Sequence, residues 1–128
     1  MKGFQFAGIC ADIKKNKKTD LGLIYCDKPA TATALFTRNK VIAAPVVLGK
    51  EKIKTGLCQA LLVNSGNANC FTGDKGLADA VTCSEMLGKE LGISTDLAIV
   101  SSTGVIGAYL PMEKFETGIP EVGKQLTE

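Results

Sequence analysis

The first half of the chain has the hydrophobic pattern of β-strands. Short apolar runs recur there between Asp, Asn, Gly and Pro residues, which is typical of strands joined by turns. The run from Cys58 to Val63 is the clearest strand, and its continuous apolar character predicts that it is buried. Strands are also predicted for an edge segment that begins at Phe4, Phe6, Ala7 and Ile9, for 21–26, for 30–37 and for 44–48.

The pattern changes to helical spacing after residue 70. Apolar residues recur every three or four positions between Asp74 and Leu91, which predicts an amphipathic helix. Either Thr72 or Asp74 can cap the start of this helix, and Gly92 suits its end.

The last third of the chain returns to a strand and then to helices. The strand is predicted at Ile93 and at 97–100. Because proline prefers the first turn of a helix, Pro111 is expected to open a helix that runs toward Gly118, and Pro120 to open another.

The order of these elements indicates an α/β or α+β layered sandwich, with a mixed sheet and helices on one of its faces. The 128 residues, 45% of them hydrophobic, fit a single domain over 1–128. The other face of the sheet needs a cover. We expect this cover from a second chain or a missing C-terminal part, because the last predicted helix stops at Glu128 without a cap or a closing strand.

The charge of the chain argues against nucleic acid as a partner. Its net charge is only +2, and Arg38 is the single arginine, so the residue type most used to read bases is scarce. The densest basic run, 14–18, lies between Asp12 and Asp20 without aromatic neighbours, and we interpret it as a solvated hairpin tip. No apolar run approaches the ~18 residues of a membrane helix, and the N-terminus lacks a targeting pattern.

The absence of histidine limits the catalytic chemistry of the chain. Neither a Ser-His-Asp triad nor a Cys-His dyad can be built from it, so an enzyme would need a nucleophile activated in another way. The five cysteines are widely spaced and form no C-x-x-C pair, so no metal site is expected. They indicate a reduced, cytoplasmic setting in which most thiols serve as small apolar residues.

Two polar segments follow the two most buried strands. NSGNAN occupies 64–69, and SSTG occupies 101–104. If the two strands are neighbours, both segments lie at one sheet edge, where ligands often bind, and the helix that follows the first could hold an anion at its N-terminus. A plain turn is the alternative for NSGNAN, because Asn and Gly tolerate left-handed backbone. A phosphate loop fits worse, since the spacing from Gly66 to Gly73 is wrong and Asp74 repels phosphate.

The segment VSSTGVIG, 100–107, allows an oxyanion hole. Such a site needs two donors aimed at one point, and Thr103-Gly104 offers a hydroxyl and a backbone N–H that no Cβ shields. The alternative is a strand end followed by a loop that glycine relaxes. Residue spacing does not decide between them.

Several motifs, in order along the chain, resemble the ornithine acetyltransferase / glutamate N-acetyltransferase family. The second half contains LVNSGNANCFTGDKG, VSSTGVIG and LPM. The first half contains GFQFAGICADIKK, DLGLI, ALFTRN and AAPV. The resemblance covers essentially all 128 residues.

The resemblance implies an arginine-biosynthesis enzyme that moves acetyl from N2-acetyl-L-ornithine to L-glutamate by a ping-pong route. In this family the precursor cuts itself, and the N-terminal threonine of the second (beta) chain becomes the nucleophile, with its own α-amine as base. The resemblance assigns the oxyanion hole to Thr103, through its side chain, and to Gly104, through its backbone N–H. No cofactor is expected, although bifunctional members accept acetyl-CoA as a co-substrate.

The resemblance places 1–128 in the N-terminal part of the alpha chain. The family's alpha chain continues to further substrate-binding residues and a Lys-Gly-Ala-Thr cleavage site. We therefore expect this chain alone to be inactive and to act in a hetero-oligomer of alpha and beta chains. The alternatives are an N-terminal-nucleophile aminopeptidase or amidase on the same scaffold, which would hydrolyse amides without acetyl transfer, and a non-catalytic fragment, which would be a stable monomer.

Overall fold

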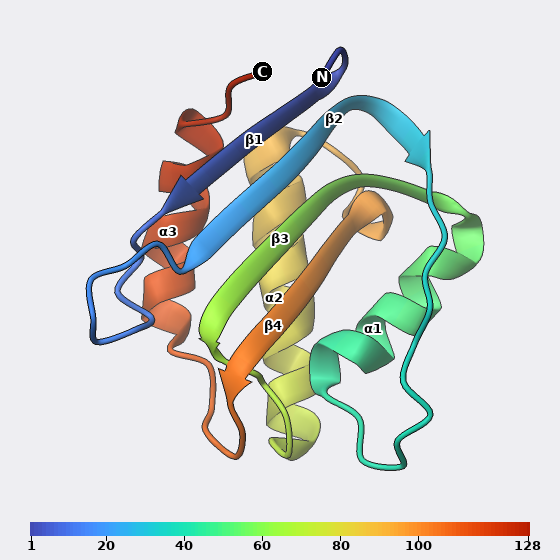
Figure 1. Cartoon of the computed structure of the whole chain (residues 1–128). Helices are drawn as coiled ribbons and strands as arrows, with labels where there is room; N and C mark the ends of the chain where they lie inside the picture. Colours follow the sequence, from blue (N-terminus) through green and yellow to red (C-terminus); the bar gives the residue numbers. More distant parts are fainter.

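Four strands form one mixed sheet in the computed structural model, which describes residues 1–128 (Figure 1). The order across the sheet is β1-β2-β3-β4. The first two pairs are antiparallel, and the β3/β4 pair is parallel. The mixed sheet and the strands expected at its start, at 21–26 and at 58–63 are confirmed. The bounds are β1 (Phe4–Ile9), β2 (Leu21–Thr31), β3 (Leu57–Asn67) and β4 (Ala98–Val105).

Three α-helices pack against this sheet. Helices α2 (Gly73–Leu91) and α3 (Met112–Lys124) lie side by side behind it, and α1 (Ala44–Lys52) flanks the edge strand β4 and contacts α2 (Figure 1). The predicted helix at 74–91 is confirmed, and Gly92 ends it in the left-handed conformation, with a φ of 65°. Two short 3₁₀ turns, η1 (Ile53–Thr55) and η2 (Thr95–Leu97), precede β3 and β4.

The strand predicted at 44–48 is wrong, because this segment begins helix α1. Pro45 lies in the first turn of the helix, where its missing N–H removes no helical hydrogen bond. The valines at 46 and 47 favour strands in isolation, but α1 packs against β4 and α2, and this packing outweighs their preference.

The strand predicted at 30–37 is also wrong beyond its first two residues. Strand β2 ends at Thr31, which pairs with Leu57, the first residue of β3. The following segment, 32–40, has no strand partner and runs past α1 as an extended connection (Figure 1). Alternating Ala and Thr residues are compatible with extended backbone, but a strand also requires a neighbour with which to pair, and this segment has none.

Two further boundaries differ from the predictions. Ile93 lies outside β4, and Leu97 belongs to η2. The two short helices expected around Pro120 are one helix, α3, which contains Pro120 in its interior and starts after Pro111. The apolar side chains on either side of Pro120 are fully buried, and their burial holds the helix together across the N–H that proline lacks.

The hydrophobic core lies between the sheet and helices α2 and α3. One face of the sheet contributes Leu21, Leu23 and Leu62, which are 0%, 1% and 2% exposed. The helices contribute fully buried residues on their inner faces, among them Leu87 and Phe115. No helix is long and apolar enough to span a membrane.

The opposite face of the sheet carries no helix, and we call it the open face. Register pairs place Phe6 opposite Ile24, Ile24 opposite Leu61 and Leu61 opposite Ile99, so one apolar row crosses all four strands. Phe6 and Ile24 are 39% and 38% exposed, and the other two are half-buried.

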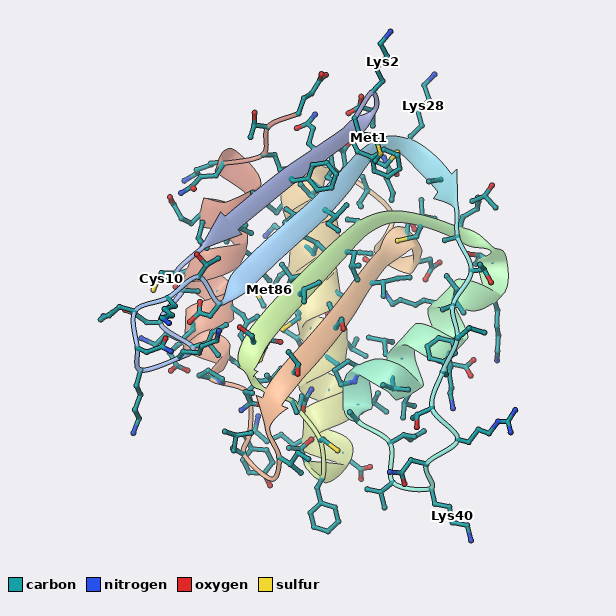
Figure 2. The ribbon with its side chains drawn as sticks, viewed as in Figure 1. Met1, Lys2, Cys10, Lys28, Lys40 and Met86 are labelled. Atoms are coloured by element: carbon teal, nitrogen blue, oxygen red, sulfur yellow. The ribbon has the colours of Figure 1, made fainter.

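Several exposed lysines point away from the ribbon. Figure 2 shows Lys2 in the turn before β1, Lys28 near the end of β2 and Lys40 in the connection before α1.

Candidate active site at the carboxyl ends of β3 and β4

The two polar segments meet, as the sequence predicts for neighbouring strands. Because β3 and β4 are parallel, their carboxyl ends lie at the same edge of the sheet. Ser65 is in register with Thr103, and Gly66 with Gly104. Both segments form part of the strands themselves, which extend further than the apolar runs indicated.

Gly104 is required by a close approach of the two backbones. Its φ is 136°, a conformation that side chains rarely adopt. A Cβ at this position would overlap the carbonyl carbon of Gly66 and lie 2.5 Å from the backbone nitrogen of Asn67. The backbone of Gly104 is thus fixed by β3 on one side, while the residue stays exposed.

Thr103 is exposed and lies on the open face. It follows Ile99 and Ser101 at intervals of two along β4, and strand residues at such intervals share a face. Its hydroxyl and the backbone of Gly104 therefore lie at the border of the open face, where a molecule that approaches this face can reach them.

Asparagines in the first polar segment connect the two strand ends. Buried Asn67 donates from Nδ2 to the carbonyl oxygens of Ala108 and Tyr109, at 3.2 and 2.8 Å. Asn64 in turn donates to the carbonyl of Asn67 at 2.9 Å. The loop after β4 is thus fastened to the end of β3, and these asparagines serve the structure.

A second set of contacts holds the loop that leads into α2. Asn69 has a φ of 45°, and it donates from Nδ2 to the carbonyl oxygen of Gly76 at 2.8 Å. Its Oδ1 accepts from the hydroxyl of Thr72 at 2.8 Å. The hydroxyl of Thr72 therefore bonds to Asn69 and makes no capping bond to the helix. Asp74 occupies the first turn of α2, and the turn interpretation of NSGNAN fits these contacts better than an anion site.

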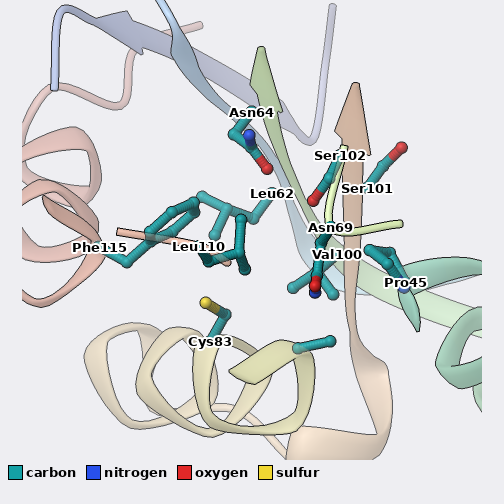
Figure 3. A pocket seen from close by; sticks show the side chains of 11 residues that line it. Pro45, Leu62, Asn64, Asn69, Cys83, Val100, Ser101, Ser102, Leu110 and Phe115 are labelled. Carbon is teal, nitrogen blue, oxygen red and sulfur yellow. The ribbon is translucent and has the colours of Figure 1, made fainter. Parts of the chain in front are cut away.

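The cavity behind the site is too small for a substrate. Its volume is about 10 Å³, the space of about one water molecule. Figure 3 shows the side chains of Asn64, Asn69 and Ser102 on one side of it and those of Phe115 and Leu110 on another.

A larger groove of about 330 Å³ lies on the open face. It runs between α1 and the extended segment 34–36 on one side and β3 and β4 on the other. Leu61 and Ile99 form its floor, and it reaches Ser101 and Ser102, directly before Thr103. The groove and the candidate oxyanion donors therefore belong to one continuous surface.

The ionisable groups near the core are structural. Burial raises the pKa of the Cys83 thiol to about 12 and also raises the pKa of Cys58, so both remain thiols. Burial lowers the pKa of Lys52, whose Nζ donates to Ser84 Oγ and to the carbonyl oxygens of Thr95 and Ala98. This lysine ties α1 to the starts of β4 and η2. No group of three or more Cys, Asp or Glu side chains could hold a metal ion.

The lysine-rich loop between β1 and β2 differs in one respect from the expected solvated tip. Lys15, Lys17 and Lys18 are exposed as predicted, but Lys14 is half-buried. The carbon stem of Lys14 lies against Gly66, so that a Cβ on this glycine would come within 2.8 Å of Lys14 Cγ. Residue patterns could not reveal this contact, because it joins residues 52 positions apart.

Comparisons with known proteins place the chain among the following relatives. The sequence profile described as the ArgJ family matches residues 5–128. The "Arginine biosynthesis bifunctional protein ArgJ" of Syntrophotalea carbinolica is 49% identical over 128 residues, which are 100% of this chain and 33% of the relative. The chain therefore spans about a third of the length of this curated relative.

Two crystal structures are similar in fold as well as in sequence. The arginine biosynthesis bifunctional protein ArgJ of Bacillus halodurans is 44% identical with a TM-score of 0.90, and the match covers 94% of this chain and 63% of that one. The ornithine acetyltransferase of Mycobacterium tuberculosis, complexed with ornithine, is 37% identical with a TM-score of 0.94, and the match covers 98% and 68%.

Proposed function

Because the chain belongs to the ArgJ family, we propose that it is the N-terminal part of an enzyme that transfers acetyl from N2-acetyl-L-ornithine to L-glutamate. Its relatives carry names of arginine biosynthesis, and one was crystallised with ornithine. Since the chain spans about a third of the first of these relatives, the activity belongs to the complete enzyme.

The role of this chain in that reaction is to stabilise an oxyanion. When a nucleophile adds to the acetyl carbonyl, the carbonyl oxygen becomes negatively charged and needs two donors about 3 Å away. Thr103 supplies its hydroxyl and Gly104 its backbone N–H. The single observation that supports this role best is the Gly66/Gly104 pairing, which fixes the backbone beside an exposed Thr103.

The acetyl group moves in two half-reactions. The hydroxyl oxygen of an N-terminal threonine on a second chain attacks the acetyl carbonyl, and the amine of that threonine takes the proton. The tetrahedral intermediate collapses, the C–N bond breaks, and ornithine leaves with that proton on its amine. The amine of glutamate then attacks the acetyl ester and loses a proton to the amine of the threonine. The C–O bond breaks, and that proton passes to the threonine oxygen, which becomes a hydroxyl again.

The second chain also supplies the cover of the open face. The apolar row from Phe6 to Ile99 and the groove beside it would otherwise stay in contact with water. A partner that packs on this face brings its own residues next to Thr103, which lies at the border of the same face. Covering the sheet and completing the active site are thus one event.

Replacing Thr103 by Ala in the complete two-chain enzyme tests the proposal. Loss of one oxyanion donor should lower kcat roughly 10²–10³-fold with little change in KM. Acetyl transfer from N-acetylornithine to glutamate is the measurement. Thr82→Ala is the matched control, because Thr82 is exposed on α2 and bonds only to the carbonyl of Ala78.

Two results would contradict the proposal. Turnover of Thr103→Ala near that of the unaltered enzyme would remove the oxyanion assignment. Hydrolysis of peptides or other amides, without acetyl transfer to glutamate, would instead favour an aminopeptidase or amidase on the same scaffold.

A further inference from the structure

We propose that Asp20 is a positioning residue for the oxyanion site, acting through the lysine-rich loop and Gly66. The inference rests on the proposed function of Thr103 and Gly104. Asp20 touches neither of them, so its effect passes through the side chains of the loop and the backbone of Gly66.

Asp20 is the anchor of the loop between β1 and β2. It is only 3% exposed, although it carries a carboxylate. Its Oδ1 accepts from the backbone N–H of Ala11 at 2.7 Å, and its Oδ2 from that of Lys14 at 2.8 Å. Each carboxylate oxygen thus holds one point of the loop, and a carboxylate, unlike an amide, can accept at both.

The backbone of Asp20 extends this anchor to the sheet. Its N–H donates to the carbonyl oxygen of Ile9 at 2.9 Å, and its carbonyl accepts from the N–H of Ser65 at 2.9 Å. Ser65 is in register with Thr103. Asp20 therefore joins the end of β1, the loop and the carboxyl end of β3.

The part of the loop that Asp20 holds packs closely against Gly66. A Cβ placed on Gly66 would lie 2.8 Å from Cγ of Lys14 and 3.2 Å from Cγ2 of Ile13. Gly66 has a φ of 109°, and its backbone lies so close to Gly104 that no Cβ fits between them. Lys14 therefore lies against Gly66, and Gly66 lies against Gly104, whose N–H is the proposed oxyanion donor.

This arrangement explains why a buried carboxylate stands before β2. If the hold on Lys14 is lost, the loop no longer confines Gly66, and the backbone of Gly104 can move. A displacement of about 1 Å at a catalytic group can reduce the rate on the order of 10²-fold. Asp20 should therefore affect kcat and leave the binding of substrate nearly unchanged.

The experiment is Asp20→Asn in the complete enzyme. Asparagine has the same shape, but its NH₂ group faces one of the two N–H donors, so one of the two hydrogen bonds is lost. We expect kcat to fall roughly 10-fold to 10²-fold, with KM within about 3-fold. The matched control is Asp12→Asn on the same loop, whose carboxylate is exposed and pairs with Lys17 at 2.9 Å. This control should leave kcat unchanged.

A double variant separates positioning from general damage to the fold. If Asp20 acts through the oxyanion site, Asp20→Asn should have little further effect on kcat once Thr103 is Ala. The inference would be overturned if the losses of kcat caused by the two substitutions multiply in the double variant. It would also be overturned if Asp20→Asn leaves kcat unchanged. In both cases the role of Thr103 still stands. If Thr103→Ala itself has no effect, the proposed function fails instead. Should Asp20→Asn not fold, Lys14→Ala replaces it in the same cycle, because it removes the Cγ that lies against Gly66 and leaves both hydrogen bonds of Asp20 in place.

Discussion

The two faces of the sheet are built from the same strands, but the chain covers only one of them. On the inner face, Leu23 and Leu62 are 1% and 2% exposed beneath helices α2 and α3. On the open face, the next residue along β2, Ile24, is 38% exposed, and Leu61 next to Leu62 is half-buried. Both faces are apolar, so their difference lies in what packs on them.

This difference shows what the continuous apolar runs of the sequence mean. A sheet with one wet face alternates apolar and polar residues, whereas strands buried on both sides are apolar throughout. The runs LGLIYC and CQALLV in β2 and β3 are of the second kind. They are typical of a sheet that is covered on both faces. The candidate active site lies at the border of the open face, which the proposed second chain would cover.

Alanine substitutions at two adjacent positions of β3, one on each face of the sheet, should give the largest difference in stability. In the 128-residue chain, Leu62→Ala leaves a cavity in the closed core and should lower the free energy of unfolding by about 2–5 kcal/mol. Leu61→Ala removes a half-buried side chain and should lower it by less than about 1 kcal/mol. Urea unfolding of the two variants measures the contrast, and equal losses would contradict the difference between the faces.

An effect confined to alkaline pH is expected from the buried thiol of the inner side. Burial raises the pKa of Cys83 from 9.0 to about 12, so the folded state keeps a proton that the unfolded state releases. The stabilisation is complete below pH 9 and is lost as the pH rises from 9 toward 12, by at most about 1.4 kcal/mol per unit. Cys83→Ala should show a shallower fall of stability over this range. The same slope in both proteins would contradict the assignment.

The rate of thiol labelling compares the two faces of the sheet by how accessible their cysteines are. Cys26 lies on the open face opposite Phe4, while Cys83 is buried, and Cys10 is exposed in a loop. In variants that each keep one cysteine, Cys10 should react fastest at pH 8, Cys26 more slowly and Cys83 least. In the complete enzyme Cys26 should become protected and Cys10 should not. Equal reactivity of Cys26 in both forms would show that nothing covers this part of the face.

Hydrophobic pattern alone predicted most of the sheet and the long helix. The strands at 58–63 and 21–26 are continuous apolar runs and the helix at 74–91 has helical spacing, and the packing of all three agrees with these patterns. The segment 44–48 has the composition of a strand, but Pro45 starts a helix there that packs on β4. The segment 30–37 is extended without a partner strand. In both cases the deciding factor is a contact with residues far along the chain.

The residues of the candidate site also differ in how far the sequence could indicate them. Thr103 and Gly104 were candidates from residue type alone, because a hydroxyl and a glycine at a strand end suit an oxyanion. The family resemblance, and not their spacing, assigned them that role, which stays a prediction. The roles of Asp20, Lys14 and Gly66 could not be inferred from the sequence, since they depend on the lysine-rich loop folding against the end of β3. The one available signal was an aspartate next to an apolar run, and that position suggests a turn more readily than a buried anchor.

The most direct test of the account is the mass of the acetyl-enzyme, formed by brief mixing of the complete enzyme with N-acetylornithine. The account predicts one acetyl group on a chain that begins with threonine, none on the chain described here, and formation roughly 10²–10³-fold slower in Thr103→Ala. Acetylation on this chain, or the same rate with alanine at position 103, would contradict it.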